Sequence, residues 1–392
     1  MSNRLVVLLL AIGAFVAGTG ELIIAGIIDL IASDLHVSVA LAGQLVTVFS
    51  LSFAIGTPFV IALTARMNRK KLLLITLACS LVGCMVAMLA DSYAAMVLSR
   101  AILGVCSGVF NVVAFALAAN LVAPDKRGSA IGSIQVGSSA SLVVGVPLGI
   151  VIAEHIGWHA IFGVLAAATV IILLVILQKL PGIPGQAAPL GNTMNGMKRP
   201  RVIAALLINL LNVVGYSVCY TFITPFLQSM AHFTHASIGL MLLLMGICAT
   251  VGSRIGGYAT DKYGVSRTLF TLLAVHAVSL LLSPLLAQSA AGAVAMIIIW
   301  GISAWATVPT TMFYLISLVP ESAEMAISVN TSVLHIGIAL GGAAGGMVVS
   351  HWSVNHVGWI GGLTVIFGLL AAICTLVVGR SKANWAKGLQ RS

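Results

Sequence analysis

The chain has 392 residues, of which 60% are hydrophobic and only 7% are charged, with a formal net charge of +10 and a mean hydropathy of +1.14. An ordinary soluble domain carries about 25% charged residues, so this composition excludes that class of protein. It predicts a polytopic helical membrane protein whose outer surface contacts the lipid bilayer.

The first apolar run, residues 5–31, carries two acids, Glu21 and Asp29. Its length exceeds the ~20 residues that a helix needs to cross a bilayer. A carboxylate at that depth costs ~2.5 to 3.5 kcal/mol, so it usually faces a protein interior or a water-filled cavity. No cleavage site follows the run, and we expect it to be retained as a membrane helix rather than removed as a signal peptide.

Eleven more apolar runs of spanning length follow: 41–63, 72–90, 94–122, 130–153, 158–177, 202–226, 238–258, 269–287, 294–318, 326–350 and 357–379. A polar segment rich in Pro, Gly and Asn separates the sixth run from the seventh and is typical of a linker. The sequence therefore predicts an all-α integral membrane protein with twelve transmembrane helices. We expect an N-terminal six-helix bundle over 1–180, a cytoplasmic linker over 181–200 and a C-terminal six-helix bundle over 201–392.

Lys and Arg lie at the termini and in alternate connections, except Arg100 and Arg254, whereas acids and histidines lie in the opposite connections. By the positive-inside rule, both termini are cytoplasmic. The net positive charge then reflects membrane topology, and we expect no nucleic-acid partner. We expect a monomeric, multi-pass protein of a bacterial inner membrane.

The six cysteines all lie within apolar runs and show neither a CxxC nor a Cys/His ligand spacing. This pattern predicts no disulfide and no metal site, and we expect no cofactor. The sequence contains no P-loop, which argues against nucleotide hydrolysis. A membrane-embedded enzyme is a remote alternative, because neither His-Glu-x-x-His nor Gly-x-Ser-x-Gly occurs.

An internal repeat relates the two halves at a constant offset of 196 residues. The matches include His36 with His232, Gly43 with Gly239, Gly56 with Gly252, Arg66 with Lys262, Pro124 with Pro320, Gly145 with Gly341 and Gly149 with Gly345. Such a repeat indicates two bundles of the same topology. It predicts a substrate site near the bilayer midplane between them, with one bundle rocking against the other.

The loop after the eighth run reads Gly-Tyr-Ala-Thr-Asp-Lys-Tyr-Gly, with Asp261, Lys262 and Gly264 at the positions of a known motif. This motif is typical of the major facilitator superfamily, which the chain resembles over nearly its whole length. The equivalent loop of the first half keeps the basic residues Arg66 and Arg69 but lacks the glycines and the acid. That departure argues against a charge-relay latch there, and topology signalling accounts for the basic residues equally well.

The fifth run contains Gly145, Pro147 and Gly149, close to the pattern of the antiporter branches of that superfamily. The two glycines are one helical turn apart and form a face on which another helix can approach closely. Proline adds a kink or a pliant point. Ordinary helix packing is an equally good interpretation.

Together with the segments 20–29 and 157–162, these features are similar to the drug/proton antiporter branch. The segments 42–45 and 329–346 resemble bacterial purine and nucleoside exporters, with sugar and chloramphenicol exporters close behind. The resemblance implies a secondary transporter that exports a small organic solute, such as a drug or a nucleoside-type metabolite, with protons as the coupling ion. An importer or symporter, or a sugar efflux permease, of the same fold remains an alternative.

Glu21, Arg100 and Asp29 are the candidate proton-coupling residues. A nearby cation favours the carboxylate and desolvation favours the neutral acid, so a carboxyl group between these influences can take up and release a proton. The resemblance supports Arg100, because an arginine at this place in the fourth span is typical of the family. A static ion pair is the alternative for Glu21 and Arg100, and a solvated helix end is the preferred interpretation of Asp29.

The candidate substrate-binding residues lie in both halves. Asn111 follows Arg100 by three helical turns and lies on nearly the same face of the helix, so with Glu21 it predicts a polar site. In the second half, Asn212, Tyr216, Tyr220 and Trp305, together with Trp300 and Phe313, predict a cavity wall on which a flat heterocycle can stack. His276 and His335 are interpreted as packing residues.

Overall fold

The structure is a computed structural model that describes residues 3–121, 127–180, 182, 198–231, 233–319 and 323–389, and every regular element in these ranges is helical. Eleven helices in the described ranges are long and apolar enough to cross a membrane. α13 (Val265–Leu281), with 17 residues, is shorter, and the short α14 (Ser283–Leu286) continues it. The predicted all-helical membrane fold is confirmed.

In the first half of the chain, four of the predicted spans are single helical elements: α1 (Asn3–Asp34), which is kinked at Ile27, α4 (Arg69–Met88), α5 (Tyr93–Leu121) and α8 (Trp158–Lys179). The other two are interrupted. The second span comprises α2 (Val39–Leu51), the π-helical turn η1 (Ser52–Gly56) and α3 (Thr57–Leu63). The fifth comprises α6 (Arg127–Ala140), the π-helical turn η3 (Ser141–Gly145) and α7 (Val146–Ile156).

Both π-helical turns directly precede a helix with proline near its start, Pro58 in α3 and Pro147 in α7. Proline has no backbone N–H, and its ring clashes with the carbonyl four residues earlier. Widening the preceding turn relieves this clash and keeps the span continuous. Regular helix is therefore interrupted before Pro58 and Pro147, whereas α15 remains helical through Pro309.

The second half forms α10 (Pro200–Tyr220), α11 (Ile223–Ala231), α12 (His235–Tyr263), α13 and α14, α15 (Ala290–Leu318), α16 (Ala323–His351), the 3-10 turn η5 (Val354–His356) and α17 (Val357–Leu389). Gly264 connects α12 to α13 with φ +81°, a left-handed conformation that glycine adopts without strain. The glycine of the family motif is thus required by the tight turn between two helices.

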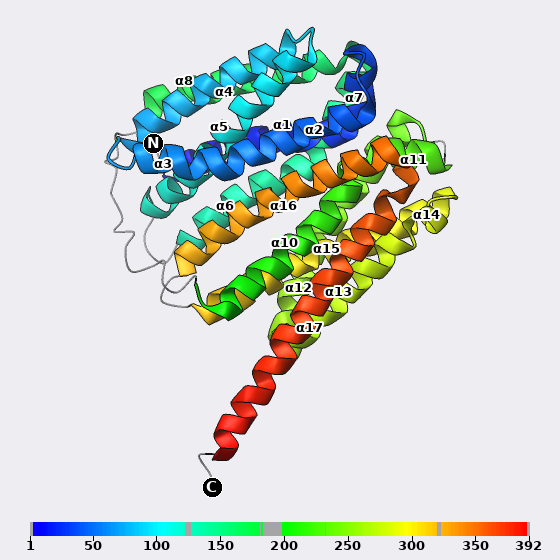
Figure 1. Ribbon diagram of the computed structural model, residues 1–392. Helices are drawn as coiled ribbons and strands as arrows, with labels where there is room; N and C mark the ends of the chain where they lie inside the picture. The colour runs from blue at the N-terminus through cyan, green and yellow to red at the C-terminus, as the bar shows by residue number, and fades with distance from the viewer. Residues whose placement is uncertain are drawn as a thin grey trace.

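The helices pack as two bundles, α1 to α8 and α10 to α17, which lie side by side with both chain termini toward the same end (Figure 1). Between the bundles, α2 packs along α16, α7 and η3 pack along α12, and α1 contacts α11. The predicted linker, 181–200, lies largely outside the described residues. The exact domain boundaries therefore stay a prediction.

Hydrogen bonds between the bundles lie toward the end remote from the termini, which we call the far end. Thr224 donates its hydroxyl to the Ala25 carbonyl at 2.7 Å, and Thr47 donates to the carbonyl of Ala339 at 3.2 Å. Gln44 lies 3.5 Å from the Gly342 carbonyl oxygen. The two bundles are in contact at the far end in this conformation.

The glycines of the fifth span permit close packing against α1. A side chain at Gly145 would meet Thr19, and one at Gly149 would meet Ile23. Their repeat partners in α16 lie in the same way against α10 and the residues after it. Both glycine stripes thus allow close helix approach within their own bundle.

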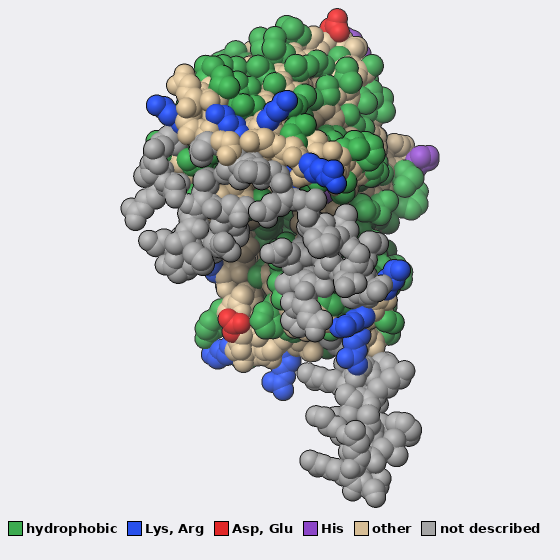
Figure 2. All heavy atoms as spheres, turned by 90° about the vertical axis from the view of Figure 1, so that its left-hand side faces the viewer, with side chains coloured by type: hydrophobic (Ala, Val, Ile, Leu, Met, Phe, Trp, Pro, Cys, Tyr) green, Lys and Arg blue, Asp and Glu red, His purple; other side chains and the backbone are tan. Residues whose placement is uncertain are grey.

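The surface has the character expected of a membrane protein. Large apolar side chains on the flanks are exposed, among them Phe59, Ile171 and Leu240. Figure 2 views the end at which the termini lie and shows Lys and Arg side chains around that end, with hydrophobic side chains covering the flanks above. This segregation matches a chain whose flanks contact lipid. That this end is cytoplasmic stays a prediction.

Substitution of two adjacent glycines of α12 tests the close packing of α12 against α15. A Cβ on Gly256 would collide with the backbone of Ala306 in α15, whereas a Cβ on Gly257 has no neighbour within 4 Å. We expect Gly256→Ala to destabilise the protein by about 1–3 kcal/mol, because backbone cannot move away cheaply. Gly257→Ala is the matched control and should be neutral or stabilising, because alanine is the better helix former. Thermal unfolding in detergent measures both, and equal effects would contradict the packing.

Candidate functional site

Glu21 of α1 lies at the boundary between the two bundles. Its Oε1 is 3.9 Å from Nδ1 of His335, which belongs to α16 in the other bundle. The Glu21 side chain is 21% exposed and that of His335 is 7% exposed. The acid is therefore directed toward the other bundle rather than toward lipid, and it remains partly accessible.

His335 also contacts the first bundle through its ring. The imidazole stacks on Phe53 of η1, with ring centroids 3.5 Å apart and planes 18° from parallel. The stack agrees with the packing role expected for His335, whereas the contact with Glu21 was not predicted. Glu21 and His335 are more than 300 residues apart and are not repeat partners, so no sequence pattern signalled this contact.

Arg100 of α5 is completely buried and binds backbone atoms of two other helices. Nη1 donates to the Gly20 carbonyl at 2.6 Å and Nη2 to the Glu21 carbonyl at 3.2 Å. Nε donates to the Leu45 carbonyl of α2 at 3.4 Å. We expected the guanidinium to face the Glu21 carboxylate, whereas its hydrogen bonds go to the main chain of that residue.

The burial of a guanidinium is tolerated because its planar fork of donors matches several carbonyl acceptors at once. The Phe49 ring adds a cation–π contact, with the Arg100 Cζ 4.3 Å from the ring centroid. The arrangement fixes one positive charge beside Glu21. It also ties α5 to α1 and α2.

Four of the aromatic residues predicted for the second half form one cluster. Tyr216 lies 5.1 Å from Tyr220, 5.3 Å from Trp300 and 6.3 Å from Trp305, measured between ring centroids. Tyr216 and Trp305 are half-buried, whereas Trp300 is completely buried. Phe313 does not share this environment, because its side chain is 53% exposed.

Asn212, predicted beside these aromatics, is instead buried within the second bundle. Its Nδ2 donates to Oγ1 of Thr307 in α15 at 2.9 Å, and its Oδ1 lies 2.8 Å from Nδ1 of His276 in α13. The side chain thus connects three helices by hydrogen bonds. This geometry gives Asn212 a structural position, and a substrate contact by this residue is not supported.

Asp29 and Asn111 differ from each other in their surroundings. Asp29 is half-buried and accepts a hydrogen bond of 2.8 Å from Gln228 of α11 across the bundle boundary, so it is more than the solvated helix end that we expected. Asn111 is half-buried, and its Oδ1 has no hydrogen-bond partner among the described residues. Asn111 is therefore the polar candidate left available for another molecule.

The motif residues lie in the turns near the termini. Arg69 donates to the Ala65 carbonyl at 3.4 Å, within its own turn, and Arg66 is exposed. Asp261 is exposed, and Lys262 contacts the rings of Tyr258 and Tyr263. The ion pairs that the structure shows do not include Asp261, and the conformational role of these residues stays a prediction.

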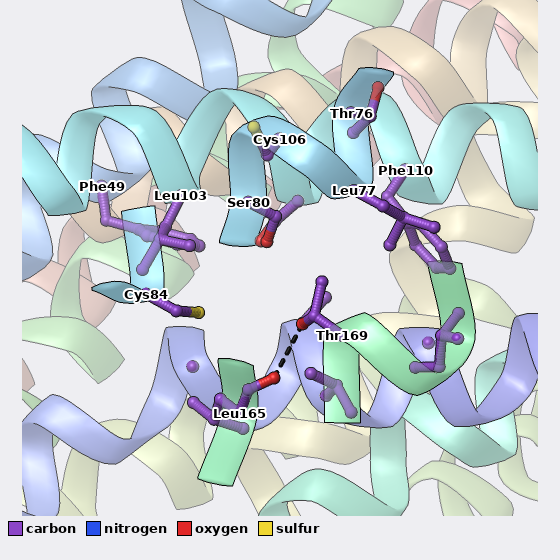
Figure 3. A pocket seen from close by; sticks show the side chains of 16 residues that line it. Phe49, Thr76, Leu77, Ser80, Cys84, Leu103, Cys106, Phe110, Leu165 and Thr169 are labelled. Carbon is purple, nitrogen blue, oxygen red and sulfur yellow. Dashed lines mark hydrogen bonds between the residues drawn. The ribbon is translucent and has the colours of Figure 1, made fainter. Parts of the chain in front are cut away.

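A small cavity lies inside the first bundle, between α1, α4, α5 and α8 (Figure 3). Ser80, Cys84 and Thr169 are among the side chains that line it, and the Thr169 hydroxyl donates to the Leu165 carbonyl at 2.7 Å. Its volume of about 30 Å³ is enough for a water molecule but far below that of an organic ligand site. The substrate site is therefore not this cavity.

In the described ranges, His, Cys, Asp and Glu form no group of three or more that could hold a metal ion. The acids, histidines and arginine of the site are instead arranged singly or in pairs.

Comparison with known proteins gives a consistent result. The Major Facilitator Superfamily profile matches residues 10–341 and 205–391. YbcL of Bacillus subtilis, described as an uncharacterized MFS-type transporter, is 37% identical, with 95% of this chain and 96% of YbcL covered. The inner membrane transport protein YdhP of Escherichia coli K12 is 31% identical over 88% of each chain. The inward-facing, unoccupied crystal structure of a bacterial homologue of the human lysosomal transporter Spinster has a similar fold, with a TM-score of 0.74 at 17% identity, covering 96% of this chain and 94% of the other.

Asn111 and Asn212 are both candidate substrate-binding residues from the sequence, but their substitution by alanine should affect stability differently. Asn212→Ala removes the side chain that bonds to both His276 and Thr307, and we expect a loss of about 1–3 kcal/mol in stability, because these buried groups lose their hydrogen bonds to it. Asn111→Ala should change stability by less than about 0.5 kcal/mol. Thermal unfolding of the two purified variants checks this. A larger loss for Asn111→Ala would reverse the assignment.

Proposed function

This chain belongs to the major facilitator superfamily and is a membrane transporter of that type, and we propose that it exports a small organic solute in exchange for protons. Glu21 is the proposed proton-carrying group. The proposed substrate site lies between the bundles, next to Glu21, the aromatic cluster and Asn111.

The location of Glu21 carries this proposal. A carboxyl group within a membrane span is costly unless it contacts protein or water. Glu21 is partly exposed, points across the bundle boundary and lies beside the fixed charge of Arg100. An acid at the surface that separates when the bundles rock is accessible from one side of the membrane at a time, which is what proton exchange by alternating access requires.

In the proposed cycle, Glu21 takes up a proton from the side at the far end, which is the outside if the termini are cytoplasmic. The bundles then rock so that the site opens toward the termini. Solute enters from that side as the proton leaves, and return of the bundles carries the solute outward. The far-end contacts between the bundles in the present conformation support assigning it to the stage that is closed at the far end.

The aromatic cluster supports a flat, partly polar solute. Stacked and edge-on rings provide apolar faces for an aromatic ligand. The Tyr220 hydroxyl and the Trp300 Nε1 are buried and have no hydrogen-bond partner among the described residues. Such groups are available to pair with the polar edge of a heterocycle, which favours nucleobase-like and aromatic drug-like compounds over sugars.

Glu21→Gln should abolish proton-coupled transport without unfolding the protein, because glutamine fills the same space but does not titrate. Purified protein reconstituted in vesicles with an internal pH dye reports protons released when a panel of purines, nucleosides, sugars and drugs is added. Glu154→Gln is the matched control, since Glu154 is an exposed acid on α7. Normal coupling in Glu21→Gln would refute the assignment of the proton to Glu21.

Trp305→Ala should weaken ligand binding, because base–aromatic or ring–ring stacking contributes about 1–3 kcal/mol per stacked group. Ligands that bind the folded state raise its thermal stability, so the same compound panel can be screened by thermal shift. Trp352→Ala is the control, because Trp352 is 68% exposed at the far end. Equal ligand-induced shifts in the wild type and Trp305→Ala would exclude the aromatic cluster from the site.

A further inference from the structure

We propose that Glu21 and His335 share a single proton and thereby form a proton-dependent link between the two bundles. The inference rests on the proposed function of Glu21 as the proton-carrying group. It goes further, because it assigns a coupling role to a histidine of the other bundle and states what the proton does to the contact.

The first step is the position of the two groups. Glu21 belongs to α1 of the first bundle and His335 to α16 of the second, and 3.9 Å separates Oε1 from Nδ1. Nδ1 of His335 has no hydrogen-bond partner among the described residues, although its side chain is only 7% exposed. A small movement of either side chain therefore completes a hydrogen bond across the boundary.

The second step is the chemistry of the pair. With one proton, the pair is either a carboxylic acid donating to a neutral imidazole or a carboxylate accepting from an imidazolium, and both arrangements attract. A hydrogen bond between ionised partners is roughly twice as strong as a neutral one. The pair loses this proton to water, and the step transfers nothing else between Glu21 and His335. A carboxylate then faces a neutral ring, which keeps one N–H that can donate to it but has lost its positive charge. The attraction between opposite charges is gone, and the link weakens.

The third step concerns the surrounding charges. Among the described residues, Arg100 of α5 and Tyr220 of α10 are the other charged or titratable groups that interact with Glu21. Arg100 is engaged by the main chain of α1 and α2, so it does not replace His335 as the partner of the carboxylate. α2, which packs along α16, carries no titratable side chain. His335 is thus the available acceptor or donor for the Glu21 proton.

The fourth step links the pair to movement. His335 is stacked on Phe53, and α16 is further bound to α2 through Thr47 and Ala339. Rocking of the bundles has to separate α16 from α1 and from the second span. A contact that is strong with a proton and weak without one makes that separation depend on protonation, which is the requirement for coupling.

The test measures conformation, so it requires no knowledge of the solute. Spin labels are attached at Ser92→Cys and Ala291→Cys, two exposed far-end positions in different bundles, in a background where the exposed Cys79 and Cys374 are replaced by serine. Pulsed electron–electron double resonance in nanodiscs then gives the fraction of protein closed at the far end between pH 5 and pH 9. In otherwise unmodified protein, we expect the closed fraction to fall at least twofold as the pH rises.

His335→Phe keeps a ring to stack on Phe53 but removes Nδ1, and we expect the closed fraction at pH 5 to fall to the value that unmodified protein shows at pH 9. Glu21→Gln provides an amide that can pair with His335 at every pH, and its closed fraction should not respond to pH. His159→Phe is the control, because His159 lies 4.0 Å from Asp34 but within one bundle. This variant should respond as unmodified protein does.

A pH response in His335→Phe equal to that of unmodified protein would overturn the shared proton. That result leaves the proposed function intact provided Glu21→Gln still abolishes proton release in vesicles. Normal proton release in Glu21→Gln refutes the proposed function itself. The conformational and transport measurements therefore separate the two failures.

Discussion

The buried guanidinium of Arg100 is the constraint on which the arrangement of the first bundle depends. Its acceptors are main-chain carbonyls of Gly20, Glu21 and Leu45, so the bonds fix the backbone of α1 and α2. Removing an acceptor would leave a charge unpaired in the protein interior, which is strongly unfavourable. Because the main chain of Glu21 is bound on the Arg100 side, its carboxyl group is free to point toward α16.

The two halves share the same helix packing but differ in their charged and aromatic residues. In each bundle, the glycines of the fifth helical span allow close packing against the first span of that bundle. At the repeat offset, however, Glu21 corresponds to Ser217 and Arg100 to Met296, while Tyr216 corresponds to Gly20. The first bundle thus holds the charged groups and the second holds the aromatic cluster. A solute between the bundles would contact charge on one side and rings on the other.

The part of the fold that the sequence predicts is the part that the lipid bilayer constrains. Apolar runs of spanning length must be helical in lipid, so the spans were predictable, and Pro147 indicated a kink in the fifth span. Side-chain direction was harder to predict. Asn212 and Tyr216 lie four residues apart and share a helix face, yet Asn212 bonds to α13 and α15 while Tyr216 joins the aromatic cluster. Helical periodicity identifies which residues share a helix face, but not which helix packs against that face. The Glu21–His335 contact could not be predicted in this way, because it depends on how the two bundles pack together.

A transporter that works by rocking needs strong contacts within each bundle and weak ones between them, and the distribution of polar bonds has this form. Within the first bundle, a charged group holds three helices together through Arg100. Between the bundles, Thr224 and Thr47 make neutral hydrogen bonds to single carbonyls, and such bonds contribute on average only about 0.6 kcal/mol in a membrane protein. The boundary contacts of Glu21 and Asp29 involve acids. Because these neutral hydrogen bonds are individually weak, the proposed protonation of an acid at this boundary would change a large share of the polar interaction between the bundles.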